Sequence, residues 1–337
     1  MNIDLSFFPS GNLQADAELV ASAEQMGFCA AWSAETARNP FLPLTIAASA
    51  TESILLGTQI AVAFPRSPMV TAQIAWDLAR QSNGRFVLGL GTQVRAHIER
   101  RFSEAWTDPI GRMREYIESL LAIWDTFQHD ARLRYRGKHY QFRLMSPFFN
   151  PGPNAKPDIP IFLAGVNPGM CRLAGETCTG LHAHVFHTAS YLRDLVLPAV
   201  EAGLAVSGRA RSDFALTVPV FVASGANDEA RRRAEAEARS RIAFYASTPS
   251  YRRVMTSQGW NEIADKLSVM ARAGQWNDMA ALIPDELLRE IAIVAAPDEV
   301  LPQIKQRYAG LADRICLDWN GIDSVTRSAI SSGLRQA

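Results

Sequence analysis

The sequence predicts an α/β protein built as one (β/α)8 barrel over residues 1–337, with insertions at about 128–158 and 226–291. Two apolar runs, Leu56–Phe64 and Gly84–Gln93, have the composition of parallel strands that are buried on both faces. A helix is expected between them, beginning after the capping residue Ser67 and stopping at Asn83. Four βα repeats fit within the first hundred residues, and no connection reverses direction as in an open sheet. This spacing favours a closed barrel.

Eight strands are expected, each a short apolar run bounded by polar, glycine or proline residues. Their ranges are Ile3–Phe8, Ala30–Ser33, Leu56–Phe64, Gly84–Gln93, Ile161–Leu163, Leu181–Val185, Leu216–Val222 and Arg314–Asp318. Apolar residues at helical spacing predict helices at Leu13–Met26, which Gly27 ends, and at Leu42–Glu52. A longer helix is expected from Pro109, after the capping residue Asp108. Its buried face is expected to contain Met113, Tyr116, Ile117, Leu120, Leu121 and Trp124.

Two segments depart from the βα alternation. In the first, Leu133–Tyr135 and Tyr140–Phe142 predict a hairpin outside the barrel, and the proline-rich stretch Pro147–Pro160 is expected to rim the site. In the second, the charged and alanine-rich stretch from Asp228 to Ile291 predicts several helices before the last strand. Because loops of a barrel carry its specificity, the rim loop Phe148–Pro157 and the insertion after Gly225 are expected to set the choice of substrate.

Composition limits the partners that this chain can have. The 34 basic and 34 acidic side chains cancel, so no net charge favours nucleic acid or a membrane surface. No apolar stretch approaches the roughly 18 residues that span a bilayer, and the chain does not begin with the pattern of a secretion signal. Cysteines 29, 171, 178 and 316 lack the spacing of a disulfide framework or a metal site. We therefore expect a soluble, cytoplasmic protein that binds small molecules.

Candidate site residues follow from the barrel itself, because active sites of α/β barrels lie at the carboxyl ends of the strands. This rule selects Phe8, Glu35, Gln59–Val62, Gln93–His97, Gly165–Gly169, His184 and His187. The turn at Gly165–Gly169 follows a strand and precedes a helix. Its backbone N–H groups could hold a phosphate, or it could be an ordinary tight turn.

Two central strands carry motifs of a known family. Leu56–Thr58, an apolar run and Pro-Arg-Ser-Pro at 65–68 are followed by Gly-Arg-Phe-Val-Leu-Gly-Leu-Gly-Thr at 84–92. Together these motifs resemble the bacterial luciferase-like monooxygenase superfamily, most closely its branch that uses the deazaflavin coenzyme F420. The resemblance extends from Asp4 to about Trp319. It implies an oxidoreductase that transfers a hydride to or from a small organic substrate, with an FMN-dependent monooxygenase as the alternative.

The same resemblance implies which residues bind the cofactor. Relatives hold the cofactor phosphate at the turn that follows the fifth strand, and a non-prolyl cis peptide at the position of Gln59-Ile60 supports the back of the ring. The residues implied to bind the cofactor are Gln59, Ile60, Ala61, Val62, His97, Gly165, Val166, Asn167 and His184.

Glu35 and His97 are the catalytic residues that the resemblance implies. Glu35 aligns with an acidic residue beside the cofactor ring, and His97 with an Asn or His directed at it. Relatives that oxidise alcohols carry a catalytic histidine and a second glutamate where this chain has Thr36 and Val94, which argues against their mechanism. On the residues alone, Glu35 could be a loop carboxylate and His97 a surface helix residue.

Other hypotheses remain open. His182 and His184 occupy alternate positions of one strand, with His187 nearby, and such a set could bind a divalent metal in a hydrolase. That site would need further ligands, and the last two strands offer only Asp318, so we assign no metal ligand. A non-catalytic protein of the same fold is a third hypothesis. The resemblance also implies a homodimer formed through the alanine-rich helices at 42–53 and 68–81.

Overall fold

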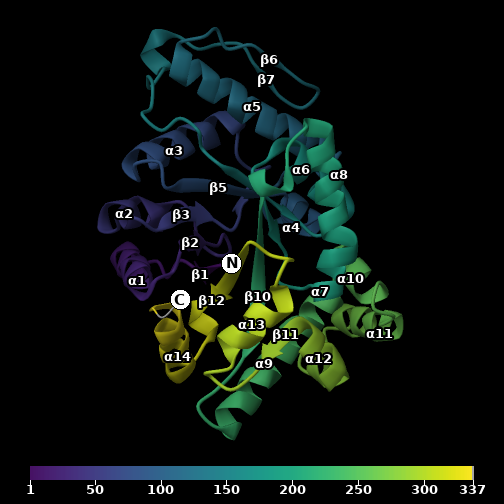
Figure 1. Ribbon diagram of the computed structural model, residues 1–337. Helices are drawn as coiled ribbons and strands as arrows, with labels where there is room; N and C mark the ends of the chain where they lie inside the picture. Colours follow the sequence, from purple (N-terminus) through teal and green to yellow (C-terminus); the bar gives the residue numbers. More distant parts are fainter. Residues whose placement is uncertain (336–337) are drawn as a thin grey trace.

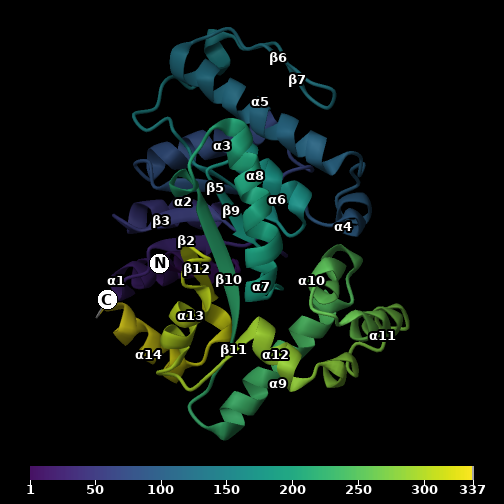
Figure 2. The ribbon, with the colours of Figure 1, turned by 45° about the vertical axis from the view of Figure 1, so that its right-hand side comes forward.

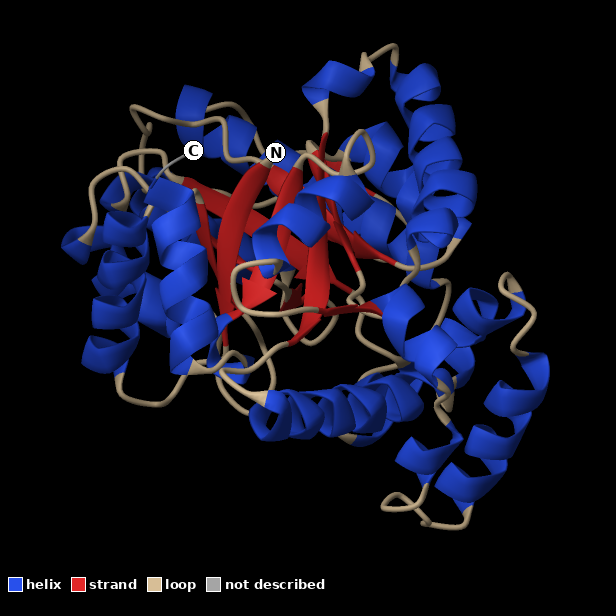
Figure 3. Ribbon diagram, turned by 60° about the horizontal axis from the view of Figure 1, so that its bottom comes forward, coloured by secondary structure: helices blue, strands red, loops and turns tan. Residues whose placement is uncertain are grey.

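The computed structural model describes residues 1–335, and its centre is a closed barrel of eight parallel strands surrounded by helices (Figure 3). The barrel strands are β1 (Asn2–Phe7), β2 (Ala30–Ser33), β3 (Leu55–Thr58), β5 (Phe86–Gly91), β8 (Ile161–Gly165), β9 (Gly180–Ala183), β10 (Ala215–Ala223) and β12 (Arg314–Asp318). Each strand pairs with the next in this series, and β12 pairs with β1, with Asn2 opposite Arg314. The predicted (β/α)8 fold is confirmed.

The third strand is interrupted where the sequence predicted one continuous strand. β3 ends at Thr58, a cis peptide bond joins Gln59 to Ile60, and β4 (Ala61–Val62) then resumes pairing with β5. The expected non-prolyl cis peptide is therefore present. The interruption lies at the carboxyl end of β3, the end of the barrel at which active sites form.

Helices cover the outside of the barrel (Figures 1 and 3). They include α1 (Leu13–Met26), α2 (Leu42–Ala50), α3 (Pro68–Gln81), α5 (Pro109–His129), α6 (Pro168–Thr177), α8 (Leu197–Ser207), α13 (Val300–Tyr308) and α14 (Ser324–Arg335). Both predicted caps are present: Ser67 accepts a hydrogen bond from the N–H of Met69, and Asp108 from the N–H of Gly111. The predicted buried face of α5 is wrong at one residue, Leu121, whose side chain is 49% exposed. It lies about 100° around the helix from the buried Leu120.

Two additions lie at opposite ends of the molecule (Figures 1 and 2). At one end the predicted hairpin, β6 (Tyr135–Arg136) and β7 (Gln141–Phe142), lies along α5. At the other end is the predicted helical insertion. Its helices are α9 (Asp228–Ala246), α10 (Arg252–Thr256), α11 (Asn261–Arg272) and α12 (Asp285–Ile291). The short strand β11 (Ala292–Val294) was not predicted from the sequence; it follows α12 and pairs with the end of β10.

No helix within residues 1–335 is both long enough and apolar enough to cross a membrane.

The interior of the barrel contains a buried ion pair that joins its first and last strands. Arg314 on β12 donates two hydrogen bonds of 2.7 Å to the carboxylate of Asp4 on β1. The indole N–H of Trp32 donates a third hydrogen bond to that carboxylate at 2.9 Å. Burial raises the pKa of Asp4, and the Arg314 guanidinium opposes this effect. Because each oxygen of the carboxylate has a partner, the charge is tolerated in the core.

The ion pair generates a stability prediction. Arg314→Met should lower the free energy of unfolding by about 3–5 kcal/mol, because it leaves the Asp4 carboxylate buried without its counter-ion. Urea denaturation measures the change. The exposed i,i+4 pair Arg95–Glu99 provides the control, and Arg95→Gln should cost less than about 1 kcal/mol. Equal effects of the two substitutions would contradict a special role for the buried pair.

Candidate active site

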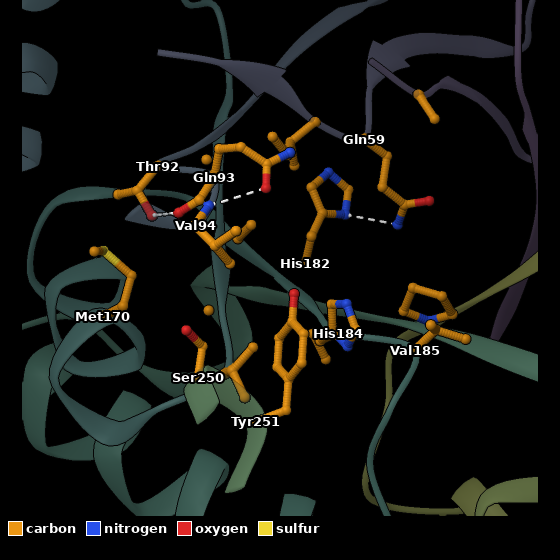
Figure 4. A pocket seen from close by; sticks show the side chains of 18 of the residues that line it. Gln59, Thr92, Gln93, Val94, Met170, His182, His184, Val185, Ser250 and Tyr251 are labelled. Carbon is orange, nitrogen blue, oxygen red and sulfur yellow. Dashed lines mark hydrogen bonds between the residues drawn. The ribbon is translucent and has the colours of Figure 1, made fainter. Parts of the chain in front are cut away.

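A cavity of about 500 Å³ opens at the carboxyl ends of the barrel strands (Figure 4). Its walls come from residues within or directly after all eight barrel strands, and from the helical insertion. Apolar side chains form most of the lining, among them Phe8, Trp106, Ile110 and Met170. A concave, mostly apolar cavity with a few polar groups is the usual form of a small-molecule site.

Gln59 is held from below the cavity by two side chains of the barrel interior. Its amide nitrogen lies 3.1 Å from Nδ1 of His182 (Figure 4), and the Cys316 thiol donates to its amide oxygen at 3.1 Å. The His182 ring packs edge-on against Trp32 at 4.8 Å. Burial lowers the pKa of His182 to about 3, so the imidazole is neutral and its Nδ1 accepts the Gln59 N–H. Gln59 therefore links β3, β9 and β12 at the cavity floor.

Glu35 lines the cavity, but both of its oxygens already have partners. Arg66 binds the carboxylate through two hydrogen bonds of 2.7 and 2.8 Å, and the backbone N–H of Val62 donates to it at 2.7 Å. The Glu35 side chain is only 6% exposed. A carboxylate in a bidentate pair with a guanidinium group is fixed in position. Its visible role is to hold β4 directly after the Gln59–Ile60 interruption.

The turn between β8 and α6 offers free backbone donors to the cavity. Among the described residues, the N–H groups of Val166, Asn167 and Gly169 have no hydrogen-bond partner. The Asn167 side chain does not cap α6, since it donates instead to the carbonyl of Ser250 at 3.1 Å. A Cβ at position 169 would come within 2.7 Å of Ile110, so glycine keeps this end of the cavity open. The predicted turn thus has the chemistry of an anion site.

An aromatic wall that sequence reasoning missed closes another side of the cavity. Tyr251 stacks on His184 with ring centres 4.2 Å apart (Figure 4), and Tyr245 meets the same ring edge-on at 4.7 Å. Nδ1 of His184 accepts the N–H of Phe186, and burial lowers the pKa of His184 to about 3. The two tyrosines come from the insertion, whose helical pattern gave no sign that it contributes to the site.

Arg241 and Asp318 form a second polar feature of the lining. Arg241 on α9 donates to Asp318 at 3.1 Å, and the other oxygen of that carboxylate is buried with no partner among the described residues. Asp318 ends the last strand, so the carboxyl-end rule could have selected it as a site residue. Arg241 carried no such signal, because its approach to Asp318 depends on how α9 packs.

The structure does not bring every expected residue to the cavity. His97 is exposed on the short helix α4 (Arg95–Arg100) and is not part of the lining. Ala61 and Val62 are buried behind Ile60, while Gln59, Ile60, Gly165, Val166, Asn167 and His184 line the cavity. His187 is buried away from it and contacts the Tyr308 hydroxyl at 3.0 Å. The expectation that Pro147–Pro160 rims the site is wrong, because none of these residues lines the cavity.

The metal hypothesis gains no support from this geometry. The described part of the chain contains no group of three or more His, Cys, Asp or Glu residues that could hold a metal ion. His182 and His184 each direct one ring nitrogen to a protein partner, Gln59 and the Phe186 N–H respectively.

The fold and the cavity together define a (β/α)8 barrel with a small-molecule site at the position that barrel enzymes use. The chain belongs to the luciferase-like monooxygenase family, which matches residues 8–314. An uncharacterized protein of Mycobacterium tuberculosis is 41% identical over 299 residues, spanning 89% of this chain and 88% of the other.

Two further proteins are similar along nearly the whole chain. A Mycobacterium tuberculosis protein provisionally named a coenzyme F420-dependent oxidoreductase is 27% identical over 324 residues, 90% of each chain. The solved coenzyme F420-dependent tetrahydromethanopterin reductase of Methanopyrus kandleri superposes with a TM-score of 0.80 at 19% identity, covering 98% of this chain and 97% of the other.

The buried histidines predict how stability depends on pH. Burial lowers the pKa of His182 and His184 to about 3 and that of His187 to about 4, below their ordinary value of 6.5. Below pH 6.5 the unfolded chain therefore binds protons that the folded chain does not, and stability falls as the pH drops. Linkage gives a loss of about 2 kcal/mol per histidine between pH 7 and pH 5.

Urea denaturation at the two pH values tests this dependence. His187→Gln should reduce the pH-dependent loss by about a third, because one of three such groups is removed. The exposed His129 serves as the control, and His129→Gln should leave the loss unchanged. A loss that is insensitive to His187 would show that this ring titrates in the folded protein.

Proposed function

We propose that this protein is a coenzyme F420-dependent oxidoreductase that transfers a hydride to or from a small organic substrate. The observation that carries the proposal is the row of free backbone N–H groups at Val166, Asn167 and Gly169, which opens onto the apolar cavity. A cofactor with a flat ring and a phosphate fits such a cavity, with the phosphate at the start of α6. The relative named for coenzyme F420 supports this choice of cofactor.

The proposed phosphate site depends on the α6 terminus. The helix dipole adds partial positive charge where the free N–H groups lie. Pro168 at the first helical position has no N–H of its own, and Gly169 leaves room beside Ile110. The Asn167–Ser250 hydrogen bond fixes this turn against the insertion. These features allow the turn to hold an anion without a basic side chain.

The proposed ring site is the wall formed by Gln59 and Ile60. Bound coenzyme F420 would supply the carbon that carries the hydride, and the protein would supply its position. Gln59 is held from the floor by His182 and Cys316, and β4 is held from the side by Glu35. Gly91 maintains the space behind Ile60, since a Cβ there would come within 2.7 Å of it. We propose Glu35 as a positioning residue that holds β4 beside this wall. For His97 to act as a proton donor at the ring, α4 would have to move.

The cofactor distinguishes this proposal from its alternative, an FMN-dependent monooxygenase. Titration of the purified protein with oxidised F420 and with FMN, followed by fluorescence, should show saturable F420 binding at least about 10-fold tighter than FMN binding, a difference of about 1.4 kcal/mol. Turnover with reduced cofactor should consume no oxygen. Tight FMN binding with oxygen consumption would replace the proposal with the monooxygenase.

Variants of the Glu35–Arg66 pair test the positioning of the ring. Glu35→Gln and Arg66→Gln should each weaken F420 binding by about 10-fold, because a hydrogen bond to a charged group contributes about 1.5–3 kcal/mol. The double variant should lose no more than either single variant, since both remove one interaction. The matched control is Arg95→Gln, which removes one partner of the exposed Arg95–Glu99 pair. Additive losses would mean that the two residues act separately.

We propose that residues 1–337 form one domain and that two copies form a homodimer through α2 and α3. These helices expose Leu42, Ile46 and Val70, which are 52%, 38% and 47% accessible. Apolar side chains on neighbouring outer helices are suited to an isologous interface. Light scattering after gel filtration should give twice the chain mass, and Ile46→Asp should reduce it to the single mass. A monomer at micromolar concentration would contradict the proposal.

We also propose a cytoplasmic location. All four cysteines are free, and Cys29 is exposed, which suits a reducing compartment. Fractionation of cells that produce the protein would test this.

A further inference from the structure

The β6–β7 hairpin has one face that packs on α5 and one that faces outward. Tyr135 and Phe142 are opposite each other and point the same way. The Tyr135 hydroxyl donates to Glu118 on α5, and the neighbouring Tyr140 ring meets Tyr116 at 5.7 Å. Because residues of an extended chain alternate between faces, Arg134 and Arg136 on either side of Tyr135, and Arg143 after Phe142, point away from α5.

Four arginines occupy that outward side, and we call them the basic face. They are Arg132, Arg134, Arg136 and Arg143, and all four are exposed. Within residues 1–335 none of them forms an ion pair. The stretch 131–146 contains no acidic residue. The neutral chain as a whole therefore conceals a strongly positive strip.

Beside the basic face lies a group of exposed apolar side chains, which we call the apolar tip. Phe148 is 89% exposed, Leu144 81% and Phe149 64%. The two phenylalanine rings contact each other edge-to-face at 5.1 Å and pack on no other aromatic ring of the described chain. Asn150 ties the segment to the end of α5 through Asp130. None of these residues lines the cavity, so the active site does not explain their exposure.

We propose that the basic face and the apolar tip form a peripheral binding site for an anionic phospholipid surface. Phosphate headgroups would meet the unpaired guanidinium groups, which bind phosphate well. The phenylalanine and leucine side chains would enter the boundary between headgroups and acyl chains. Such binding requires no membrane-spanning helix. The two additions at opposite ends of the molecule then have separate roles (Figures 1 and 2). The helical insertion contributes to the cavity, and the hairpin binds the lipid surface.

Charge decides between this partner and a second copy of the chain. In a symmetric dimer formed through this patch, the basic face would lie against its own copy, and like charges would repel. A single-stranded nucleic acid would satisfy the charge and could stack a base on Phe148 or Phe149, but it would leave the apolar side chain of Leu144, which is 81% exposed, without a partner. An anionic bilayer satisfies both the charge and the apolar side chains.

Sedimentation with lipid vesicles tests the proposal, using the full chain. The protein should bind vesicles of phosphatidylcholine mixed with phosphatidylglycerol, should not bind phosphatidylcholine alone, and should bind less as salt is raised. Replacing the four arginines of the basic face by glutamine should weaken binding by about 100-fold or more. Phe148→Ser with Phe149→Ser should weaken it by about 10-fold or more.

A matched control removes four exposed arginines from the distant insertion: Arg232, Arg233, Arg272 and Arg289. This variant should bind vesicles like the unmodified protein, and F420 titration should be unchanged in every variant, so the result does not depend on the proposed function. Equal binding to phosphatidylcholine, or no binding to phosphatidylglycerol, would overturn the proposal. Tighter binding to single-stranded RNA than to the vesicles would also overturn it. The same holds if the mass of the basic-face variant falls from that of a dimer to that of a monomer.

Discussion

Closure of the barrel is the constraint on which the rest of the structure depends. β1 and β12 lie at opposite ends of the chain, and the Asp4–Arg314 pair joins them inside the barrel beside their backbone pairing. The pair is stable there because Trp32 and the two guanidinium bonds satisfy the carboxylate. Closure brings the carboxyl ends of all eight strands together, and without it Gln59 on one side and Cys316 on the other would not meet.

Two sets of polar contacts support the site above the ion pair, one at its floor and one at its side. The Gln59 amide is fixed by His182 and Cys316, so its contacts bridge three strands across the floor. Glu35 and Arg66 hold the backbone of β4 at the side. Both arrangements restrict atoms near the proposed ring site before any ligand arrives. Such preorganisation lowers the ordering cost of binding and is a common property of sites that position a cofactor.

Much of the fold follows from local patterns in the sequence. Buried parallel strands read as apolar runs, and their alternation with helices limits the topology to few choices. The caps at Ser67 and Asp108 and the stop at Gly27 are local, so they could be located from the chain alone. The turn at Gly165–Asn167 follows from the rule for barrel active sites. The interruption at Gln59-Ile60 came from the family resemblance, since a plain strand was the expectation from the residues themselves.

The sequence by itself determined the barrel, the order of its strands and which chain segments reach the site, because periodicity and strand ends are local properties. Tertiary packing alone decided which side chains at those ends are free. Arg66 occupies the Glu35 carboxylate, α4 turns His97 to the surface, and the proline-rich segment lies at the end of α5 instead of the cavity rim. Arg241 and Tyr251 enter the site from an insertion whose sequence shows only helices. Contacts between distant segments depend on packing geometry, and no local pattern in the chain encodes that geometry.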